Sequence, residues 1–516
     1  MNLGAMQRHA ERDVVDAVVI GTGAGGAPLL ARLATAGLRV VALEAGRNWQ
    51  PADHTPDETE AADLYWLDER LSDGAMPQAF GGNNSGIGVG GSTLHWGAFT
   101  PRPDVRDMQL RTRTGKGFDW PIDHAELTAY IERVERFIGV SGPSPYPWDA
   151  ARRYPLPPVA RNAPAHAMAS GCATLGITAT DAPAAVVSRD WQQLDGLQRQ
   201  ACVNCGACHQ GCRNAAKTSM DVTFLPLAVA HGAEIRPECR VHGIERDARG
   251  RITAVVYRAG GVDHRQRCAA VILCAGGVET PRLMLHLGIG NSSGQVGRNF
   301  MAHVATQVWG RFEPEMRCNR GYPSSLITED FLRPEGADFA GGYLIQSLGV
   351  LPVTWATSVA RGRGLWGQAL VDAIDDYRRM AGIGINGECL PDDDNRLVLG
   401  DERDAFGMPK AKVTFSYGAN EHAIDRHAVR TLSAIWSAAG ASGIHAIARS
   451  AHTIGTCRMG TDADAAVVNA DGRSFDIDNL WLCDNSVFPS SLAANPALTI
   501  MALSLRTADR FLRGHH

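Results

Sequence analysis

The sequence lacks the long apolar runs that membrane proteins need. No window approaches the uninterrupted stretch of about 18 apolar residues that a transmembrane helix requires, and the first residues, Met1 to Asp13, are polar. A secretion signal would instead begin with a basic segment followed by an apolar one. We therefore expect no direct insertion into a membrane and, from the encoded chain alone, a cytoplasmic protein.

Charge of one sign is also scarce. The formal net charge is −5, charged residues make up 20% of the chain, and they form no long run of one sign. Partners such as nucleic acids and anionic membrane surfaces are bound by basic patches or tails, which this sequence does not show. We expect no nucleic-acid partner.

Cysteine is too dilute for a disulfide scaffold, at 12 residues in a chain of 516. The hydrophobic fraction of 45% excludes intrinsic disorder. At about 150 residues per domain, the length predicts two or three domains. The chemistry must therefore be sought in local motifs.

A glycine fingerprint follows the first apolar segment of strand length. The run from Val14 to Ile20 leads into Gly21-x-Gly23-x-x-Gly26, a helical pattern follows, and Glu44 ends the next apolar run. In a βαβ unit such glycines permit a tight turn against a pyrophosphate, which the helix N-terminus attracts. Glu44 would accept hydrogen bonds from ribose hydroxyls and repel a 2′-phosphate, so the pattern favours FAD or NAD over NADP.

The middle of the sequence predicts a separate α/β lobe. Between about residues 304 and 444, alternating strands such as 396–399 accompany two amphipathic helices, at 365–380 and 421–439. No motif in this lobe identifies a substrate.

Four of the cysteines are crowded into one loop, Cys202-x-x-Cys205-x-x-Cys208-x-x-x-Cys212. This spacing matches the bacterial ferredoxin run that binds an iron–sulfur cluster. Arg213 replaces the proline that follows the fourth cysteine in ferredoxins, so the loop would hold a 4Fe-4S or, with three thiolates, a 3Fe-4S cluster. A structural zinc site and plain thiols or disulfides that brace the loop are the alternatives.

Two polar residues near the C-terminus are candidates for catalysis. The turn after His452 contains Gly455 and would let the imidazole project into a cavity as a base. Asn495 and Pro496 precede an apolar periodic run, which is typical of an N-cap and a first helical residue. The positive end of that helix would stabilise negative charge on a reduced flavin. Taken alone, a single histidine or a capped helix is more often structural.

Together these motifs resemble the glucose–methanol–choline (GMC) oxidoreductases, flavoproteins that oxidise alcohols and sugars. The resemblance rests on Gly21 to Gly26 with Glu44-Ala45-Gly46, on Gly90 to Trp96, on Ala275 to Pro281, and on the His452 and Asn495 motifs. It covers nearly all of the FAD-binding part and only loosely the middle lobe. The chain is most similar in appearance to the FAD-containing large subunits of bacterial gluconate and glucose dehydrogenases and, more distantly, to pyranose oxidase.

The resemblance implies roles for the site residues. His452 would accept the hydroxyl proton while hydride leaves the same carbon for flavin N5, and Asn495 would hydrogen-bond the substrate oxygen. His95 matches the position at which pyranose oxidase attaches its flavin covalently, and the alternative is a ring packed over the flavin. Asp484 would contact the ribityl chain or the pyrophosphate. The full FAD-binding set is Gly21, Gly23, Gly26, Glu44, Gly91, Ser92, His95, Trp96, Val241, Asp484 and Pro496.

The resemblance also implies partners. Related dehydrogenases carry an iron–sulfur cluster between the flavin and an outside acceptor, which favours that interpretation of the cysteine loop. Electrons would then pass to a protein acceptor such as a cytochrome, and a small subunit could carry the folded chain to the periplasm.

The expected fold is α/β, with a Rossmann-like FAD-binding domain of the GMC type and an interleaved α+β substrate domain on an antiparallel sheet. The FAD-binding domain would comprise residues 1–110, 195–303 and 445–516, and the substrate-binding domain residues 111–194 and 304–444. The expected function is FAD-dependent oxidation of a CH–OH group of a sugar, polyol or related alcohol. The alternatives are an oxygen-using oxidase of the pyranose-oxidase type with structural cysteines, and a non-catalytic FAD-binding assembly subunit.

Overall fold

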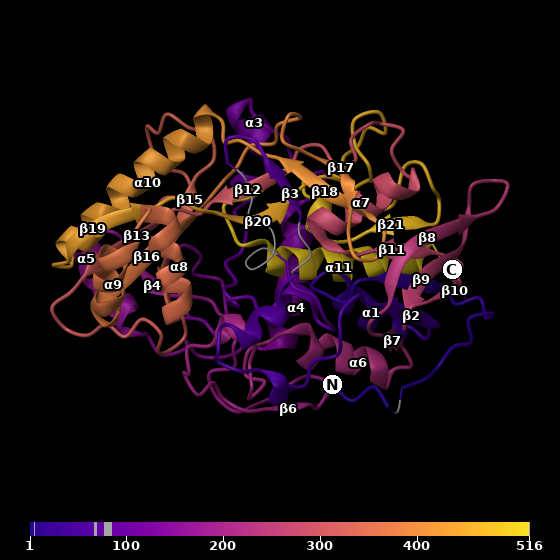
Figure 1. The fold of residues 1–516 in the computed structure, drawn as a ribbon, viewed down its shortest axis with the longest axis horizontal. Coiled ribbons are helices and arrows are strands. Elements are labelled where there is room, and N and C mark those ends of the chain that lie inside the picture. Colours follow the sequence, from indigo (N-terminus) through magenta and orange to yellow (C-terminus); the bar gives the residue numbers. More distant parts are fainter. Residues whose placement is uncertain (5, 67–69, 77–84, 515–516) are drawn as a thin grey trace.

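The computed structural model describes every residue except 5, 67–69, 77–84 and 515–516. Two lobes lie side by side (Figure 1). A parallel sheet with its helices occupies one lobe, and a larger antiparallel sheet covered by α5 and α10 occupies the other. Among the described residues, no helix is both long and apolar enough to cross a membrane.

The parallel sheet has five strands in the order β21-β11-β1-β2-β7. Nearly all of their side chains are buried, as expected for parallel strands covered on both faces. Helices α1, α6 and α11 pack together beside the sheet. The strands are β1 (Ala17–Ile20), β2 (Val40–Leu43), β7 (Glu234–Arg236), β11 (Val271–Leu273) and β21 (Leu480–Leu482), and the helices are α1 (Gly26–Thr35), α6 (Phe224–Ala230), α7 (Gly276–Leu287) and α11 (Pro496–Arg513). Segments that are distant in the sequence therefore build one parallel sheet.

The larger sheet has eight strands, and its main path is β19-β13-β16-β15-β14-β4. Helices α5 (Ala163–Thr174) and α10 (Ala419–Ala438) pack on it around a core that includes Ile383, Leu432 and Trp436. The strands are β4 (Thr180–Asp181), β12 (Met301–Val304), β13 (Gln307–Arg311), β14 (Leu326–Thr328), β15 (Tyr343–Leu348), β16 (Met380–Gly387), β19 (Ser442–Ile447) and β20 (Ser450–Ile454).

Strands β12 and β20 bring two histidines that are distant in the sequence close together. They pair antiparallel, with His303 opposite Ala451 and Val304 opposite Ser450. Strand β12 also pairs with β16. This register places His303 beside the strand that carries His452.

The remaining elements are small. An antiparallel sheet contains β8 (Arg240–Arg246), β9 (Ile252–Ala259) and β10 (Val262–Arg267). A mixed sheet contains β3 (Leu71–Asp73), β17 (Arg396–Arg403) and β18 (Pro409–Thr414), with β17 antiparallel and β3 parallel to β18. A hairpin joins β5 (Trp191–Gln192) to β6 (Gln198–Arg199), and the other helices are α2 (Val105–Met108), α3 (Leu110–Thr114), α4 (His124–Ile138), α8 (Pro352–Arg363) and α9 (Gly367–Asp375).

Two observations bear on the expectations from sequence. The single helix predicted over 365–380 is confirmed as α9 and a 3-10 turn that continues it over Asp376–Arg379. It is wrong only at its end, because Met380 begins β16, which is fully buried between β13 and β15. Cross-strand pairing thus overrides the local helical pattern.

The second observation concerns the predicted domains. Helix α4, in the predicted substrate-binding segment, packs against α11, in the predicted FAD-binding segment, and the side chains of Arg506 and Arg510 form ion pairs with Glu126. The predicted domain boundaries stay a prediction.

Candidate active site

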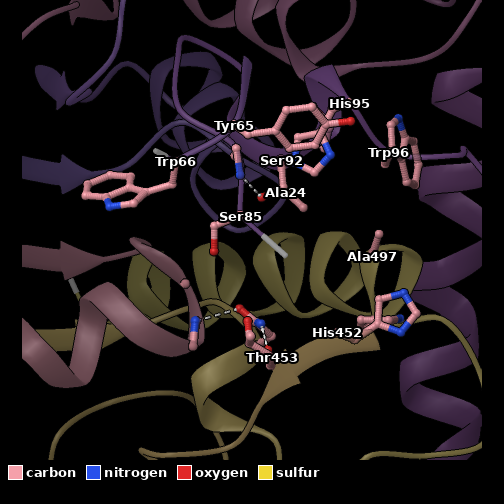
Figure 2. Close-up of a pocket in the computed structure, with 18 of the residues that line it drawn as sticks. Ala24, Tyr65, Trp66, Ser85, Ser92, His95, Trp96, His452, Thr453 and Ala497 are labelled. Atoms are coloured by element: carbon pink, nitrogen blue, oxygen red, sulfur yellow. Dashed lines mark hydrogen bonds between the residues drawn. The ribbon is translucent and has the colours of Figure 1, made fainter. Parts of the chain in front are cut away.

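A cavity of about 490 Å³ reaches from the carboxyl ends of the parallel strands to the antiparallel sheet. Figure 2 shows its two sides, with Tyr65, His95 and Trp96 along one wall and His452 and Thr453 opposite. In open α/β sheets, ligands bind at the carboxyl ends of the strands. The cavity therefore lies where a dinucleotide is expected.

The predicted glycine fingerprint forms the turn between β1 and α1. Gly21 has a φ of +97°, and a Cβ there would lie 2.5 Å from the carbonyl oxygen of Cys274, so only glycine fits. Gly21 and Gly23 line the cavity. Gly26 is instead buried in the first turn of α1, against the carbonyl of Gly21. Its part is to pack the helix on the turn, so that the helix N-terminus faces the cavity.

Glu44 follows β2 and is buried in the cavity wall. Its carboxylate accepts hydrogen bonds from the backbone N–H and the hydroxyl of Thr22, at 3.0 and 2.8 Å, and from the N–H of Gly46 at 3.1 Å. Burial raises the pKa of Glu44, and these hydrogen bonds oppose that rise. The side chain therefore holds the Gly21 turn in place, while its contact with a ribose stays a prediction.

Asp484, Val241 and Pro496 line the same cavity from three other segments. The Asp484 carboxylate accepts from the N–H of Gly276 at 2.8 Å and from the hydroxyl of Thr280 at 2.6 Å. It thereby joins the segment after β21 to the start of α7. These positions are compatible with the predicted contacts to a cofactor.

The segment Gly91 to Trp96 supplies the opposite wall. Gly91 begins a short 3-10 helix, and a Cβ on it would lie 2.7 Å from the Cα of Gly23, so this segment packs directly on the fingerprint turn. Ser92 lines the cavity and accepts a hydrogen bond from the N–H of Gly86 at 2.9 Å. Trp96 lines it as well.

His95 is buried in this wall, with its ring centroid 4.4 Å from that of Tyr65. Its Nε2 atom has no hydrogen-bond partner among the described residues. Burial, reinforced by the nearby positive charge of Lys217, lowers the pKa of His95 to about 3. The imidazole is therefore neutral, and one of its nitrogens is left for a group that enters the cavity.

His452 forms a relay with His303, a residue that the sequence alone did not indicate. The two Nδ1 atoms are 2.8 Å apart, and His303 Nε2 lies 2.8 Å from the carbonyl oxygen of Leu492 and 3.1 Å from that of Ser491. Since carbonyls only accept, His303 Nε2 carries the hydrogen. Burial lowers the pKa of His303 to about 4, so its ring is neutral and its Nδ1 accepts a hydrogen bond.

The relay fixes the tautomer of His452. Its Nδ1 must donate to His303, and burial together with His303 lowers the pKa of His452 well below the usual value. The ring is thus neutral, and the lone pair of its Nε2 faces the cavity and the amide of Asn495. His452 also has a φ of +63°, a strained conformation for a residue other than glycine. The main chain is held in this shape at the residue that the sequence predicts as the base.

Asn495 occupies the N-cap position of α11, as predicted, but its side chain makes no capping hydrogen bond. Its Oδ1 instead accepts from Asn386 Nδ2 at 2.9 Å, and its Nδ2 lies 3.4 Å from His452 Nε2. Asn386, in β16, was not indicated by the sequence because nothing in its apolar strand marks it. It turns the Asn495 amide so that an N–H donor faces the base.

The cysteine loop lies close to the His95 wall. The Lys217 ammonium donates to the carbonyl oxygens of Leu94 at 2.7 Å and of Cys208 at 2.6 Å, and the Lys217 N–H donates to Cys212 Sγ at 3.3 Å. Burial lowers the pKa of Lys217 to about 8. The buried lysine therefore joins the loop to the segment that carries His95.

The four cysteines do not form a ligand set. Cys208 is buried, Cys202 and Cys212 are half-buried and Cys205 is exposed, and all 12 cysteines of the chain are free thiols. Within the described parts of the chain, no three or more His, Cys, Asp or Glu side chains are grouped so that they could hold a metal ion. The side-chain positions thus support neither the predicted iron–sulfur cluster nor the alternatives of zinc and disulfides.

The chain is similar to known proteins both in sequence and in fold. Models of the GMC oxidoreductase family match residues 75–305 and 391–504. The chain is 31% identical to the fructose dehydrogenase large subunit of Gluconobacter japonicus, over 96% of this chain and 97% of that one. It is 27% identical to the gluconate 2-dehydrogenase flavoprotein of Pantoea cypripedii, over 96% and 93%. Pyridoxine 4-oxidase from Mesorbium loti has the same fold, with a TM-score of 0.66 at 17% identity over 97% of this chain and all of that one.

Proposed function

The chain belongs to the GMC oxidoreductase family, and we propose that it oxidises a CH–OH group of a sugar, polyol or related alcohol. The observation that carries this proposal is a pair of polar atoms, His452 Nε2 and Asn495 Nδ2, that lie side by side in the cavity wall. A base nitrogen on His452 and an amide donor on Asn495 converge from different strands and helices. A hydroxyl group is the substrate function that needs both.

The cofactor that the family implies is FAD, and the cavity has the features that FAD requires. The glycine turn and helix N-terminus suit a pyrophosphate, Glu44 and Asp484 offer acceptors, and His95 has an unpartnered nitrogen in the wall. When bound there, FAD supplies the acceptor for the hydride.

The protein residues then act on the hydroxyl. The substrate oxygen accepts a hydrogen bond from Asn495 Nδ2, while its proton lies toward His452 Nε2 and passes to that atom. The amide donor stabilises the negative charge that develops on the oxygen. His303 accepts from His452 Nδ1 and so holds the ring with its base nitrogen forward. Proton removal and charge stabilisation together weaken the C–H bond of the same carbon.

The neutral state of the two histidines favours this arrangement. A protonated His452 could not accept a proton, and burial keeps its pKa low. General-base catalysis contributes about 10²- to 10⁴-fold to a rate. We therefore expect His452→Ala to reduce the rate of flavin reduction by at least about 100-fold, with His166→Ala on the exposed face of α5 as the matched control.

The test is anaerobic flavin reduction across sugars, polyols and aromatic alcohols, with a dye acceptor for turnover. The proposal fails if no CH–OH compound reduces the flavin, or if His452→Ala reduces it as fast as the unaltered chain. The latter result would favour the non-catalytic assembly subunit. Rapid reoxidation by air with formation of peroxide would instead identify an oxidase.

An iron–sulfur cluster at Cys202, Cys205, Cys208 and Cys212 is the part of the proposal that rests on spacing alone. The described side-chain positions do not fit it, so the mechanism above uses no step through such a cluster. Iron and acid-labile sulfide measured on the purified protein test it directly. A stoichiometric content of both would support the cluster, and the absence of both would overturn it.

A partner subunit is supported by similarity only. The fructose dehydrogenase relative is named a large subunit, and this chain covers 97% of it. We therefore propose that a smaller subunit assembles with this chain. Purification with and without the neighbouring gene products, followed by size-exclusion chromatography, tests this assembly.

A further inference from the structure

Arg449 is a charged side chain in the cavity wall that no other described residue neutralises. It lies in the part of the cavity that is lined by the antiparallel sheet. It lines the cavity together with Ala305, Gln307 and Gln346, all of which are uncharged. Its backbone carbonyl accepts a hydrogen bond from the N–H of Ala305 at 3.0 Å, which fixes it between β19 and β20. The cation is therefore built into the sheet beside the catalytic strand.

The other charged side chains of the cavity wall all have partners. Glu279 pairs with Arg70 and Arg282 at 2.9 Å each, and Asp404 pairs with Arg282 at 2.7 Å. Arg240 stacks on Phe406, with its guanidinium 3.7 Å from the ring centroid. Arg449 differs, since no hydrogen bond or ion pair of its guanidinium is formed with any described residue.

An unpaired guanidinium in such a position is costly unless a ligand completes it. Burial lowers the pKa of Arg449, and no neighbouring carboxylate opposes this effect. Arginine nevertheless remains charged in proteins, and its planar fork matches a carboxylate with two parallel hydrogen bonds. Buried charges are normally paired, so the missing partner is expected to come from outside the chain.

From this geometry we propose that the substrate is a hydroxy carboxylate whose carboxylate pairs with Arg449 while its hydroxyl lies between His452 and Asn495. This inference rests on the proposed function and names the substrate class of the same site. Arg449 precedes His452 by three residues, and three residues of extended chain span at most about 10 Å. Both residues line the same cavity, so a short carbon chain bearing both groups can be held between them.

Matched neutral and anionic compounds test the proposal. Anaerobic flavin reduction is compared for glycerol, glycerate and glycerol 3-phosphate, and for glucitol and gluconate. We expect the carboxylates to exceed their neutral counterparts by about 30-fold or more in kcat/KM, and Arg449→Gln to remove that advantage, so that the anionic and neutral compounds no longer differ. Arg361→Gln, on the exposed surface of α8, removes the same charge elsewhere and should change nothing.

A second readout does not depend on turnover. Titration calorimetry with glycerate should show binding to the unaltered protein and to Arg361→Gln, and none to Arg449→Gln. Since the variant loses an unpaired, partly buried cation, its melting temperature should not fall. Arg449→Lys should keep part of the affinity, because it retains the charge without the fork.

The possible failures are distinct. If no compound of any kind reduces the flavin, the proposed function fails, and binding of glycerate to Arg449 is still measured by calorimetry. If neutral alcohols are oxidised and carboxylates neither bind nor react, only the carboxylate proposal fails. A preference for glycerol 3-phosphate would assign the arginine to phosphate esters and overturn it. Loss of FAD from Arg449→Gln would assign the guanidinium to the cofactor and overturn it too.

Discussion

The tautomer relay between His303 and His452 makes a quantitative prediction. His303→Ala removes the acceptor that fixes the hydrogen on His452 Nδ1, and it leaves that N–H and the carbonyl of Ser491 without partners. Losing the orienting hydrogen bond costs about 1–2 kcal/mol, which is about 5- to 30-fold in the rate of flavin reduction. The two buried unpaired groups and the cavity lower the free energy of unfolding by about 3 kcal/mol.

The assay must separate a loss of orientation of the His452 ring from a loss of folding stability. Stopped-flow absorbance under anaerobic conditions measures flavin reduction at saturating substrate, and thermal unfolding measures stability on the same samples. His303→Asn is the matched variant, because its Oδ1 keeps an acceptor near the position of Nδ1 while it removes the ring. We expect His303→Asn to keep most of the rate of the unaltered protein, whereas His303→Ala shows the full loss.

The pH profile provides an independent readout. His452 acts as a base only when neutral, and with its pKa lowered by burial it stays neutral as the pH falls through the usual histidine range. His303→Ala opens the site to water, which moves the pKa of His452 back toward its ordinary value. The acid limb of kcat/KM should therefore move to higher pH in the variant. An Ala variant with the normal rate and an unshifted profile would refute the relay.

Three further predictions concern the base, the cofactor and the cysteines. In the unaltered enzyme, kcat/KM should stay constant down to a pH well below 6.5, because the pKa of His452 lies well below that value, and a decline centred near 6.5 would contradict this assignment. If His95 is the covalent attachment site, acid precipitation should leave yellow flavin in the pellet of the unaltered protein and release it from His95→Ala; flavin in the supernatant of both would end the covalent hypothesis and leave the packed ring. Cys205→Ser, which alters the exposed thiol, should abolish iron content if the loop binds a cluster, whereas equal iron in both proteins would exclude it as a ligand.

The nucleotide-binding half could be predicted because its chemistry is local. The turn at Gly21 needs glycine for steric reasons that operate within a few residues, and Glu44 ends the very next strand. The predicted helices over 421–439 and from Pro496 onward are likewise close to α10 and α11, since their apolar faces repeat with the helical period. The helix predicted over 365–380 is likewise confirmed for most of its length, and only its end is wrong, because Met380 begins a strand that is fixed by its neighbouring strands.

The candidate catalytic site could be predicted only in part, because its geometry depends on long-range pairing. His303 is one of 17 histidines and lies in an unremarkable apolar stretch. It reaches His452 only because β12 pairs with β20 in one particular register. Asn386 reaches Asn495 across a similar sequence distance, from a different strand. Arg449 becomes distinctive only when the partners of every other charged group in the wall are known.

The behaviour of Asn495 shows how a local preference yields to the site, and it can be tested by adding one charge. The residue type is a common N-cap, yet its amide is held by Asn386 and faces His452.

Asn495→Asp keeps the acceptor for Asn386 and replaces the donor beside His452 Nε2 with a carboxylate. A negative charge there favours the imidazolium, so the pKa of His452 rises. Below that raised pKa the base is protonated, and flavin reduction should fall by about 100-fold or more near neutral pH, then recover partly as the pH increases. The protein should remain folded, because the carboxylate also lies at the positive end of α11. A variant with normal activity and an unaltered pH profile would show that the donor on Asn495 and the neutral state of His452 are not what the reaction requires.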